Sequence, residues 1–325
     1  MRVFLIGAGA SAALSRNIPI TKTILPSLVE LSAYKLYADD RTSAINEYLN
    51  SKAIPSLEHW KTTYIDTQKQ PNLEELIETA LVEDTPLGRG FYEAILHAFY
   101  QLIEKPLAQI LNEQRQTVYW ALVRQLKADD VVLSLNYDTA LDSSISNFYH
   151  RGGVGMPYHI NYGPNSALAF EDILPNRALP VLLKLHGSFN WISELNKIRV
   201  YRKGKVPQVN YEGWNVQVVP PHITKGRLPR HKVLDEVWEC ADSYTKDAVD
   251  DLVVIGCSLQ PYDVELTQLL SKFTPSTVKL ITLKRNEQNY NELVQRCQDI
   301  FKIDKSKLRI WGKGFTREGL TSLGI

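Results

Sequence analysis

Short apolar runs that end in small or polar residues dominate the hydrophobic pattern of this chain. They lie at 2–6, 130–138, 181–185, 252–255 and 279–283, and a further short one lies at 308–311. Continuous apolar runs of this length, bounded by turn residues, are typical of strands buried on both faces of a parallel sheet. A helical pattern at 287–301 precedes the last run. The pattern predicts an α/β protein with a Rossmann-like parallel sheet.

Between the first two runs the pattern changes to helical spacing. Leu73, Leu76, Ile77 and Leu81 recur on one side of a helix, and similar sets follow up to about residue 127. We therefore expect a mainly helical insertion at 22–127. From 142 the chain becomes rich in glycine and predicts loops, and 198–219 alternates enough to predict hairpin strands. The expected organisation is one domain over 1–325, with a small interrupted module at 142–245 around the strand that ends at His186.

Composition narrows the classes of protein that remain. The formal net charge of +1 gives no overall attraction to nucleic acid or to a membrane. We find no apolar run long enough for a membrane helix and no signal-peptide pattern, so a cytoplasmic protein is the simplest interpretation. The three cysteines, Cys240, Cys257 and Cys297, form no C-x-x-C pair, which argues against a zinc ribbon and a disulfide framework.

The first strand ends in a glycine turn that fits phosphate binding. Gly7, Gly9 and Ala12 match the looser G-x-G-x-x-A form of the dinucleotide fingerprint. Glycine lets the backbone approach a phosphate closely, and the first amides of the following helix point at the anion. The same residues also suit a tight strand-to-helix turn that binds nothing, and the turn alone leaves both interpretations open.

The other strands also end in residues that carry chemistry. Asn136 and Asp138 follow the second strand, His186 follows the third, and Gly256 and Ser258 follow the fourth. Ligands of open parallel sheets bind outside the carboxyl ends of the strands, so we expect these groups to converge on one crevice. There histidine suits a general base, asparagine suits orienting a water or a carboxamide, and aspartate suits stabilising positive charge.

Taken in order, these clusters resemble the sirtuin superfamily, and most of all the bacterial sirtuin-like proteins of anti-phage defence. The matching segments are Gly7-Ala8-Gly9-Ala10-Ser11, Ile18-Pro19, Asn136-Tyr137-Asp138, Leu185-His186-Gly187-Ser188-Phe189-Asn190-Trp191 and Gly256-Cys257-Ser258-Leu259. Pro220-Pro221, Lys225, Trp238, Asp263 and Gly314-Phe315 also look like this bacterial branch.

The resemblance implies NAD as substrate, no metal, and hydrolysis of the nicotinamide–ribose bond by an NAD-depleting antiviral effector. In that family pattern Asn136 and Asp138 hold the nicotinamide end and His186 is the general base. The remaining positions would bind NAD through its phosphates, riboses or adenosine: Gly7, Ala8, Gly9, Ala10, Ser11, Pro19, Gly256, Ser258, Asn286 and Phe315. It also implies a homo-oligomer and a partner encoded nearby, either an ATPase or a nucleic-acid-handling protein.

Two departures from the family favour hydrolysis over deacylation. Deacetylase sirtuins carry a four-cysteine zinc module that three cysteines cannot form, and Pro19 is followed by Ile20 and Thr21 instead of Phe-Arg. Three alternatives stay open: a sirtuin-like deacylase or ADP-ribosyl transferase, a non-catalytic NAD-sensing subunit, and an ordinary dehydrogenase. A dehydrogenase needs an acidic residue ending a second strand, and Glu30 lies instead in a stretch of helical pattern.

One stretch of the chain bears on partners. Between Arg199 and Lys232 the basic residues greatly outnumber the single acid, Glu212. Such a stretch is either a solvated basic loop or a docking face for an acidic partner or nucleic acid. The sequence does not separate these two interpretations.

Overall fold

The computed structural model describes most of the chain in segments. They are 1–14, 40–60, 73–104, 107, 117–149, 161–162, 170–171, 178–194, 197–200, 216–218, 232–261, 263–284 and 286–325. Contacts divide the chain into a sheet unit (1–16, 107–218 and 230–325) and a helical unit (17–106 and 219–229). Pro19, Glu30 and most of the basic stretch lie outside the described residues.

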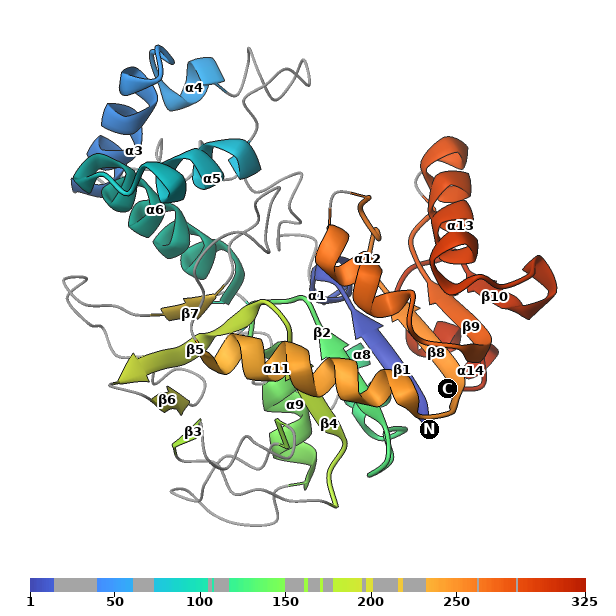
Figure 1. The fold of residues 1–325 in the computed structure, drawn as a ribbon. Helices are drawn as coiled ribbons and strands as arrows, with labels where there is room; N and C mark the ends of the chain where they lie inside the picture. Colours follow the sequence, from blue (N-terminus) through green and yellow to red (C-terminus); the bar gives the residue numbers. More distant parts are fainter. Residues whose placement is uncertain are drawn as a thin grey trace. The chain divides into compact units, whose positions relative to one another are not determined.

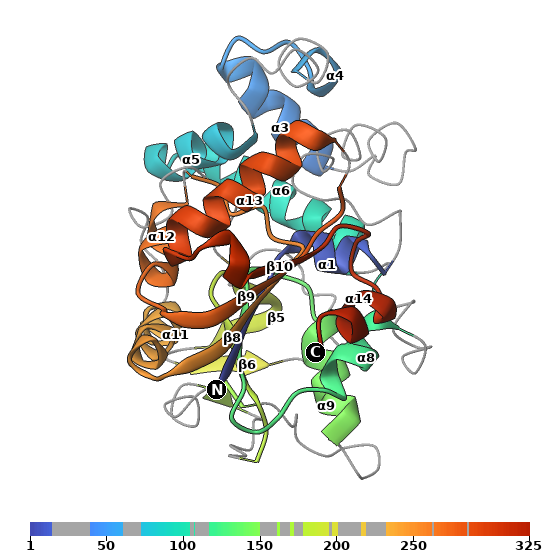
Figure 2. The same cartoon turned by 90° about the vertical axis from the view of Figure 1, so that its right-hand side faces the viewer.

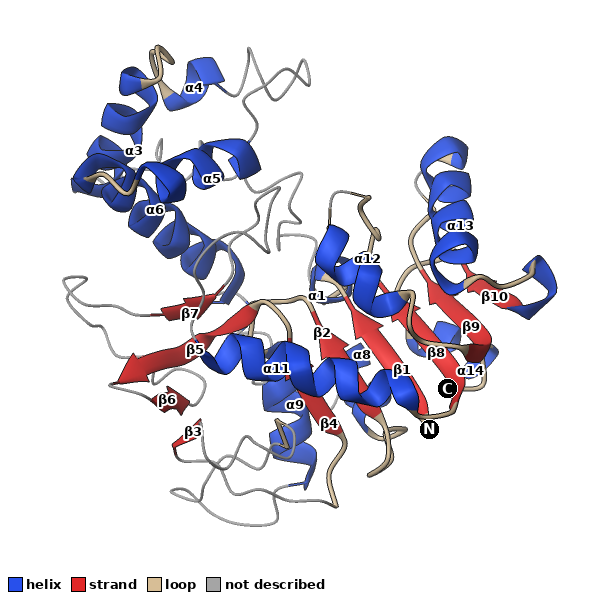
Figure 3. Cartoon of the chain, viewed as in Figure 1, coloured by secondary structure: helices blue, strands red, loops and turns tan. Residues whose placement is uncertain are grey.

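A six-stranded parallel sheet forms the core of the sheet unit (Figure 3). Its order is β10-β9-β8-β1-β2-β4, and the strands are β1 (Arg2–Ile6), β2 (Val131–Ser134), β4 (Val181–Lys184), β8 (Val249–Ile255), β9 (Pro275–Ile281) and β10 (Leu308–Trp311). If these six strands are numbered 1 to 6 as they occur in the chain, their order across the sheet, read from β4, is 3-2-1-4-5-6. This is the strand order of dinucleotide-binding doubly wound sheets. The predicted Rossmann-like fold is therefore confirmed.

The carboxyl ends of the strands are level with one another. Ile6 pairs with Ser134 on one side and with Ile255 on the other, and Ser134 pairs with Lys184. The amide following each strand then donates to its neighbour, as Gly7 N does to Ile255 O at 2.9 Å. The turns after β1, β2, β4 and β8 consequently emerge along one edge, as the strand-end pattern predicts.

Helices cover both faces of this sheet. Helices α11 (Lys232–Ser243) and α12 (Val264–Leu270) lie on one face, and α8 (Val118–Val123) and α9 (Ala140–Tyr149) lie on the other (Figures 1 and 2). Helix α13 (Glu287–Phe301) links β9 to β10, within the bounds that the sequence predicts. Helix α14 (Arg317–Ser322) ends the chain and contacts α8. Covered on both faces, β1, β2, β4 and the last four residues of β8 and of β9 are buried apart from Arg2, which explains their continuous apolar runs. In β10, at the edge of the sheet, only Leu308 is buried.

A second, four-stranded sheet contains the small module. Its order is β3-β6-β5-β7, with β3 (Phe170–Glu171), β5 (Gly187–Glu194), β6 (Lys197–Val200) and β7 (Val216–Val218). The sequence predicts hairpin strands within 198–219, where β6 and β7 lie, and both are antiparallel to β5, a strand that it does not predict. Gly187 has φ of +76°, so the chain turns out of the large sheet directly after His186 and starts β5.

The expected loop from residue 142 is wrong in its first part, because α9 is a helix there. Its buried face carries Ser143, Ser144 and Ser146 as well as apolar residues. Polar residues at core positions removed the apolar periodicity by which the sequence would have identified this helix.

The helical unit, described by itself, contains α3 (Asp40–Ser51), α4 (Leu57–Trp60), α5 (Leu73–Glu83), α6 (Pro86–Phe99) and a π-helical turn η2 (Tyr100–Glu104). Helix α6 starts with the Thr85 side chain accepting from Gly88 N at 3.0 Å and with proline in its first turn. It packs on α3 and α5, and Tyr48 of α3 stacks on Phe91 at 4.5 Å between ring centroids. In the parts of the chain described, no helix has the length and apolar character needed to span a membrane.

Candidate active site

A contact between glycines joins the turns after β1 and β8. Helix α1 (Ala8–Ala12) begins here, and Gly9 N donates to Gly256 O at 2.9 Å. A Cβ on Gly256 would lie 2.3 Å from Ala10 N, and one on Gly7 would lie 2.7 Å from the Cα of Cys257. Gly256 also has φ of +61°, which side chains rarely allow. The strand order reverses at this point, and only glycine fits these two turns.

On the other side of β1, Ser11 is the centre of a buried polar network. Its hydroxyl donates to Asp138 Oδ2 at 2.7 Å, accepts from Asn136 Nδ2 at 2.8 Å and lies 3.1 Å from the hydroxyl of Tyr119. Ser11 is 2% exposed and Tyr119 is fully buried. The structure thus brings together three of the predicted site residues, from turns more than a hundred residues apart.

Asn136 is the member of this network with spare hydrogen-bonding capacity. The residue is 6% exposed, and its Oδ1 has no hydrogen-bond partner among the described residues. Buried side-chain oxygens nearly always have a partner, and one left without a donor costs roughly 1–3 kcal/mol. Since Ser11 fixes the orientation of Nδ2, Oδ1 is an acceptor held ready for a donor from outside the network.

Asp138 uses both carboxylate oxygens within the protein. Oδ1 accepts from Ala140 N at 3.0 Å, at the start of α9, and Oδ2 accepts from Ser11. Burial raises the pKa of this carboxyl above its ordinary value, while the charge of Lys184 and the hydrogen bond from Ser11 oppose that shift. Burial, together with the charge of Asp138, also raises the pKa of the Tyr119 phenol, so Tyr119 remains a neutral hydroxyl.

Lys184, which the sequence did not single out, contacts this network at the main-chain carbonyl of Asp138. It is the last residue of β4 and is completely buried. Its ammonium donates to the main-chain carbonyl of Asp138 at 2.6 Å and to Asp142 Oδ2 at 2.9 Å. The one available signal was a charged residue inside an otherwise apolar run. Tyr119 had no such signal, because it lies in an ordinary helical pattern.

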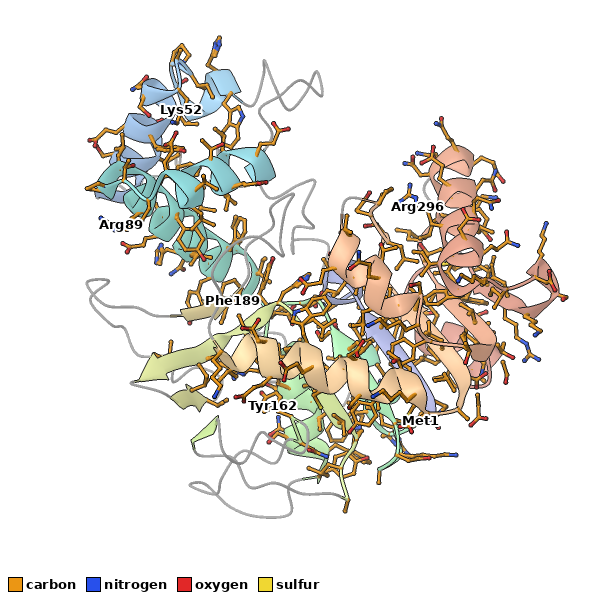
Figure 4. The ribbon with its side chains drawn as sticks, in the orientation of Figure 1. Met1, Lys52, Arg89, Tyr162, Phe189 and Arg296 are labelled. Atoms are coloured by element: carbon orange, nitrogen blue, oxygen red, sulfur yellow. The ribbon has the colours of Figure 1, made fainter. Side chains whose placement is uncertain are left out.

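His186 belongs to a neighbouring group that also includes Tyr137, Trp238 and Asp263. Its Nε2 lies 3.9 Å from Asp263 Oδ2, and its ring is 6.2 Å from Tyr137 and 6.5 Å from Trp238 between centroids. Trp238 donates to the carbonyl of Leu185 at 2.8 Å, which fixes the turn before His186. Phe189, labelled in Figure 4, lies edge-on to Tyr137 at 5.8 Å. His186 is 4% exposed, so this imidazole is held by packing.

The remaining predicted residues make no direct hydrogen bond, among those described, with Ser11, Asn136 or Asp138. Ala8 and Ser258 are exposed, and Ser258 O accepts from Arg296 at 2.9 Å. The side chain of Asn286 caps α13 by accepting from Asn289 N at 2.8 Å, so its amide oxygen already has a structural role. Phe315 is buried with its ring edge-on to Tyr119 at 5.5 Å, which connects the end of the chain to the Ser11 network.

A hollow of about 260 Å³ lies elsewhere on the sheet unit. It is lined by Trp120, Ala121, Arg124, Gln125 and Arg317, and by none of the predicted site residues. The candidate site consists of the buried polar groups and not of this hollow. In the described part of the chain, no three His, Cys, Asp or Glu side chains are grouped as they would be to hold a metal ion.

Comparisons with known proteins found similarity to solved structures. No protein-family model matches the chain, and no curated protein matches it. A solved structure described as "Structural Basis for the Mechanism and Regulation of Sir2 Enzymes" is similar to it at 15% sequence identity and a TM-score of 0.34. The match covers 99% of this chain and 92% of that one.

Proposed function

We propose that this protein binds NAD along the carboxyl edge of the sheet and hydrolyses its nicotinamide–ribose bond. The observation that carries the proposal is the Asn136 carboxamide, buried, oriented by Ser11, and left with an acceptor oxygen without a donor. The amide of nicotinamide and the ribose hydroxyls are donors of the kind that this oxygen requires. A ligand that fills this position gains a hydrogen bond that the protein alone does not make.

The topology supports a dinucleotide as the ligand. In sheets of order 3-2-1-4-5-6, dinucleotides lie across the crevice where the strand order reverses. Here that point is the contact of Gly7, Gly9 and Gly256, with the Ser11 network directly beside it on the β2 side. NAD placed with its phosphates at the glycines has its nicotinamide end at Asn136.

The residues suit cleavage by water. Loss of nicotinamide breaks the bond from C1′ to the ring nitrogen, whose electron pair leaves with nicotinamide, and positive charge develops on the ribose. The Asp138 carboxylate stabilises that charge, and water forms the new C1′–O bond. His186, held beside Asp263, accepts the proton that the water loses. The products are nicotinamide, ADP-ribose and one proton.

We also propose that the activity depletes NAD in the cytoplasm as an antiviral response, in a homo-oligomer triggered by a partner. This rests on the sequence resemblance to anti-phage sirtuin-like proteins. A triggered enzyme is quiet when purified alone, so the protein encoded by the neighbouring gene belongs in the assay.

Nicotinamide release tests the proposed activity. The protein is incubated with NAD in ¹⁸O-labelled water, alone and with the neighbouring protein, beside His186→Ala and Asp242→Ala, the latter a partly exposed carboxylate on α11 that pairs with Lys272. Hydrolysis gives nicotinamide and ADP-ribose carrying one ¹⁸O, from the wild type and Asp242→Ala only. Release that needs an acyl-lysine peptide would identify a deacylase. No release by the wild type under any of these conditions would contradict the proposal.

A further inference from the structure

We infer that Lys184 is a positioning residue of this site, whose buried ammonium holds the Asn136–Asp138 turn in place and brings a positive charge to it. The expected effect of Lys184 on nicotinamide release rests on the proposed function. The contacts of Lys184 and its effect on the Asp138 carboxyl do not depend on NAD.

The cost of burying Lys184 is the first reason to expect a specific role. The residue is 0% exposed at the end of an apolar strand, and its only carboxylate contact among the described residues is with Asp142, itself 1% exposed. A buried ion pair is often no more stabilising than apolar side chains of the same volume. An apolar side chain there would nevertheless lose the hydrogen bond to the Asp138 carbonyl.

The partners of Lys184 are themselves fixed. Tyr162 donates to Asp142 Oδ1 at 2.9 Å, so both oxygens of Asp142 are engaged. Trp191 of β5 donates from Nε1 to the Tyr162 hydroxyl at 3.4 Å, with the two rings edge-on at 5.1 Å. A continuous chain of contacts therefore runs from the small sheet through Tyr162 (labelled in Figure 4) and Asp142 to Lys184 and the Asp138 carbonyl.

The charge of Lys184 acts on the Asp138 carboxyl. Burial raises the pKa of that carboxyl, and Lys184 is the largest influence that lowers it. The other charged or titratable groups that face Asp138 are Asp142 from α9, which raises its pKa, and Tyr119 from α8, which is neutral. Loss of Lys184 would favour the protonated acid, in which one oxygen carries a proton and the carboxyl no longer accepts equally well from both the Ser11 hydroxyl and Ala140 N.

The Asp138 titration tests this without reference to NAD. Lys184→Met alone leaves Asp142 buried without its cation, so the informative variant is Lys184→Met/Asp142→Asn. Carboxyl ¹³C NMR, with Asp138→Asn to assign the signal, should show Asp138 titrating at higher pH in the double variant. Asp142→Asn alone should move the midpoint to lower pH, because it removes a like charge and leaves Lys184. The opposite directions of the two shifts separate the effect of the Lys184 charge from that of the Asp142 charge.

Tyr162→Phe is the matched control, since it breaks the same chain of contacts but leaves both charges. Its Asp138 midpoint should stay at the wild-type value. In the pH profile of nicotinamide release, the acid limb should move to higher pH in the double variant and not in Tyr162→Phe. A midpoint in Lys184→Met/Asp142→Asn that is no higher than that of Asp142→Asn would overturn the inference. A wild type that releases no nicotinamide would overturn the proposed function instead, while the NMR titration still decides the role of Lys184.

Discussion

The contacts on the two sides of β1 depend on different physical requirements. Toward β8, the contact of Gly7, Gly9 and Gly256 consists of main chain only and depends on the absence of side-chain atoms. Toward β2, the network of Ser11 and Asp138 depends on particular donors and acceptors. On the β8 side the residues are limited by the space available, and on the β2 side they are limited by the hydrogen bonds that they must make. Substitutions on the β8 side should therefore affect mainly stability, whereas those on the β2 side should affect chemistry as well as stability.

Gly256→Ala should have the largest effect. A Cβ there would lie 2.3 Å from Ala10 N, and φ is +61°. Left-handed strain and overpacking together predict a loss of roughly 2–6 kcal/mol in the free energy of unfolding, measured with urea. Gly312→Ala is the control, because the nearest atom to its Cβ, Lys284 Cβ, is 3.6 Å away. Equal unfolding midpoints for the two variants would show that the glycine contact is not a steric constraint.

Asp138→Asn should affect chemistry most. Loss of the carboxylate should lower nicotinamide release about 10²–10³-fold, as for other groups that stabilise transition-state charge. Because burial raises the pKa of Asp138, its charged form opposes folding. The contribution of Asp138 to the free energy of unfolding is most favourable below the ordinary carboxyl pKa, and it declines as pH rises through the raised pKa of Asp138.

The stability of Asp138→Asn relative to wild type should therefore improve with rising pH. Urea unfolding at about pH 5 and about pH 8 measures this difference. A variant that retains full turnover, or that loses stability relative to wild type as pH rises, would contradict the account of Asp138.

Ser11→Ala should have an intermediate effect on stability. It removes the hydroxyl shared by Asp138, Asn136 and Tyr119 and leaves buried polar atoms without partners. We expect a loss of about 1–3 kcal/mol in unfolding free energy. Ser271→Ala, which removes an exposed hydroxyl, should change it by less than about 0.5 kcal/mol. If Ser11→Ala were as mild as this control, the network would not contribute to folding.

Tyr119→Phe should have the smallest effect. The ring keeps its edge contact with Phe315, and Ser11 keeps its bonds to Asp138 and Asn136. One buried hydrogen bond is worth about 0.5–1.5 kcal/mol, read as a shift in the urea midpoint. A loss larger than that of Ser11→Ala would place the centre of the network at Tyr119 instead.

The main sheet was predictable because its determinants are local. Each strand of the main sheet is a short apolar run, and α13 has a clear helical period between Asn286 and its last residue, Phe301. The small sheet was harder, because β5 starts at a left-handed turn at Gly187 and its pairing with β7 shifts in register between Gly187 and Ile192. Helix α9 was missed because serines occupy buried positions of its core-facing side.

The sequence singles out individual residues of the candidate site but not the hydrogen bonds between them. Asn136, Asp138 and His186 stand out as polar strand ends, yet nothing local indicates that Ser11 joins Asp138 across 127 residues of sequence. Lys184 shows the same limit, since its partners at Asp138 and Asp142 follow a different strand. Only the register of the sheet brings these atoms together.

The most direct test of the account is the affinity for NAD at Asn136. Isothermal titration with carba-NAD, which cannot be hydrolysed, compares the wild type with Asn136→Ala. Loss of the buried acceptor should weaken binding by roughly 10- to 100-fold, which corresponds to about 1–3 kcal/mol. A wild type that does not bind carba-NAD, or two proteins that bind it equally, would contradict the central claim that Asn136 Oδ1 receives the ligand.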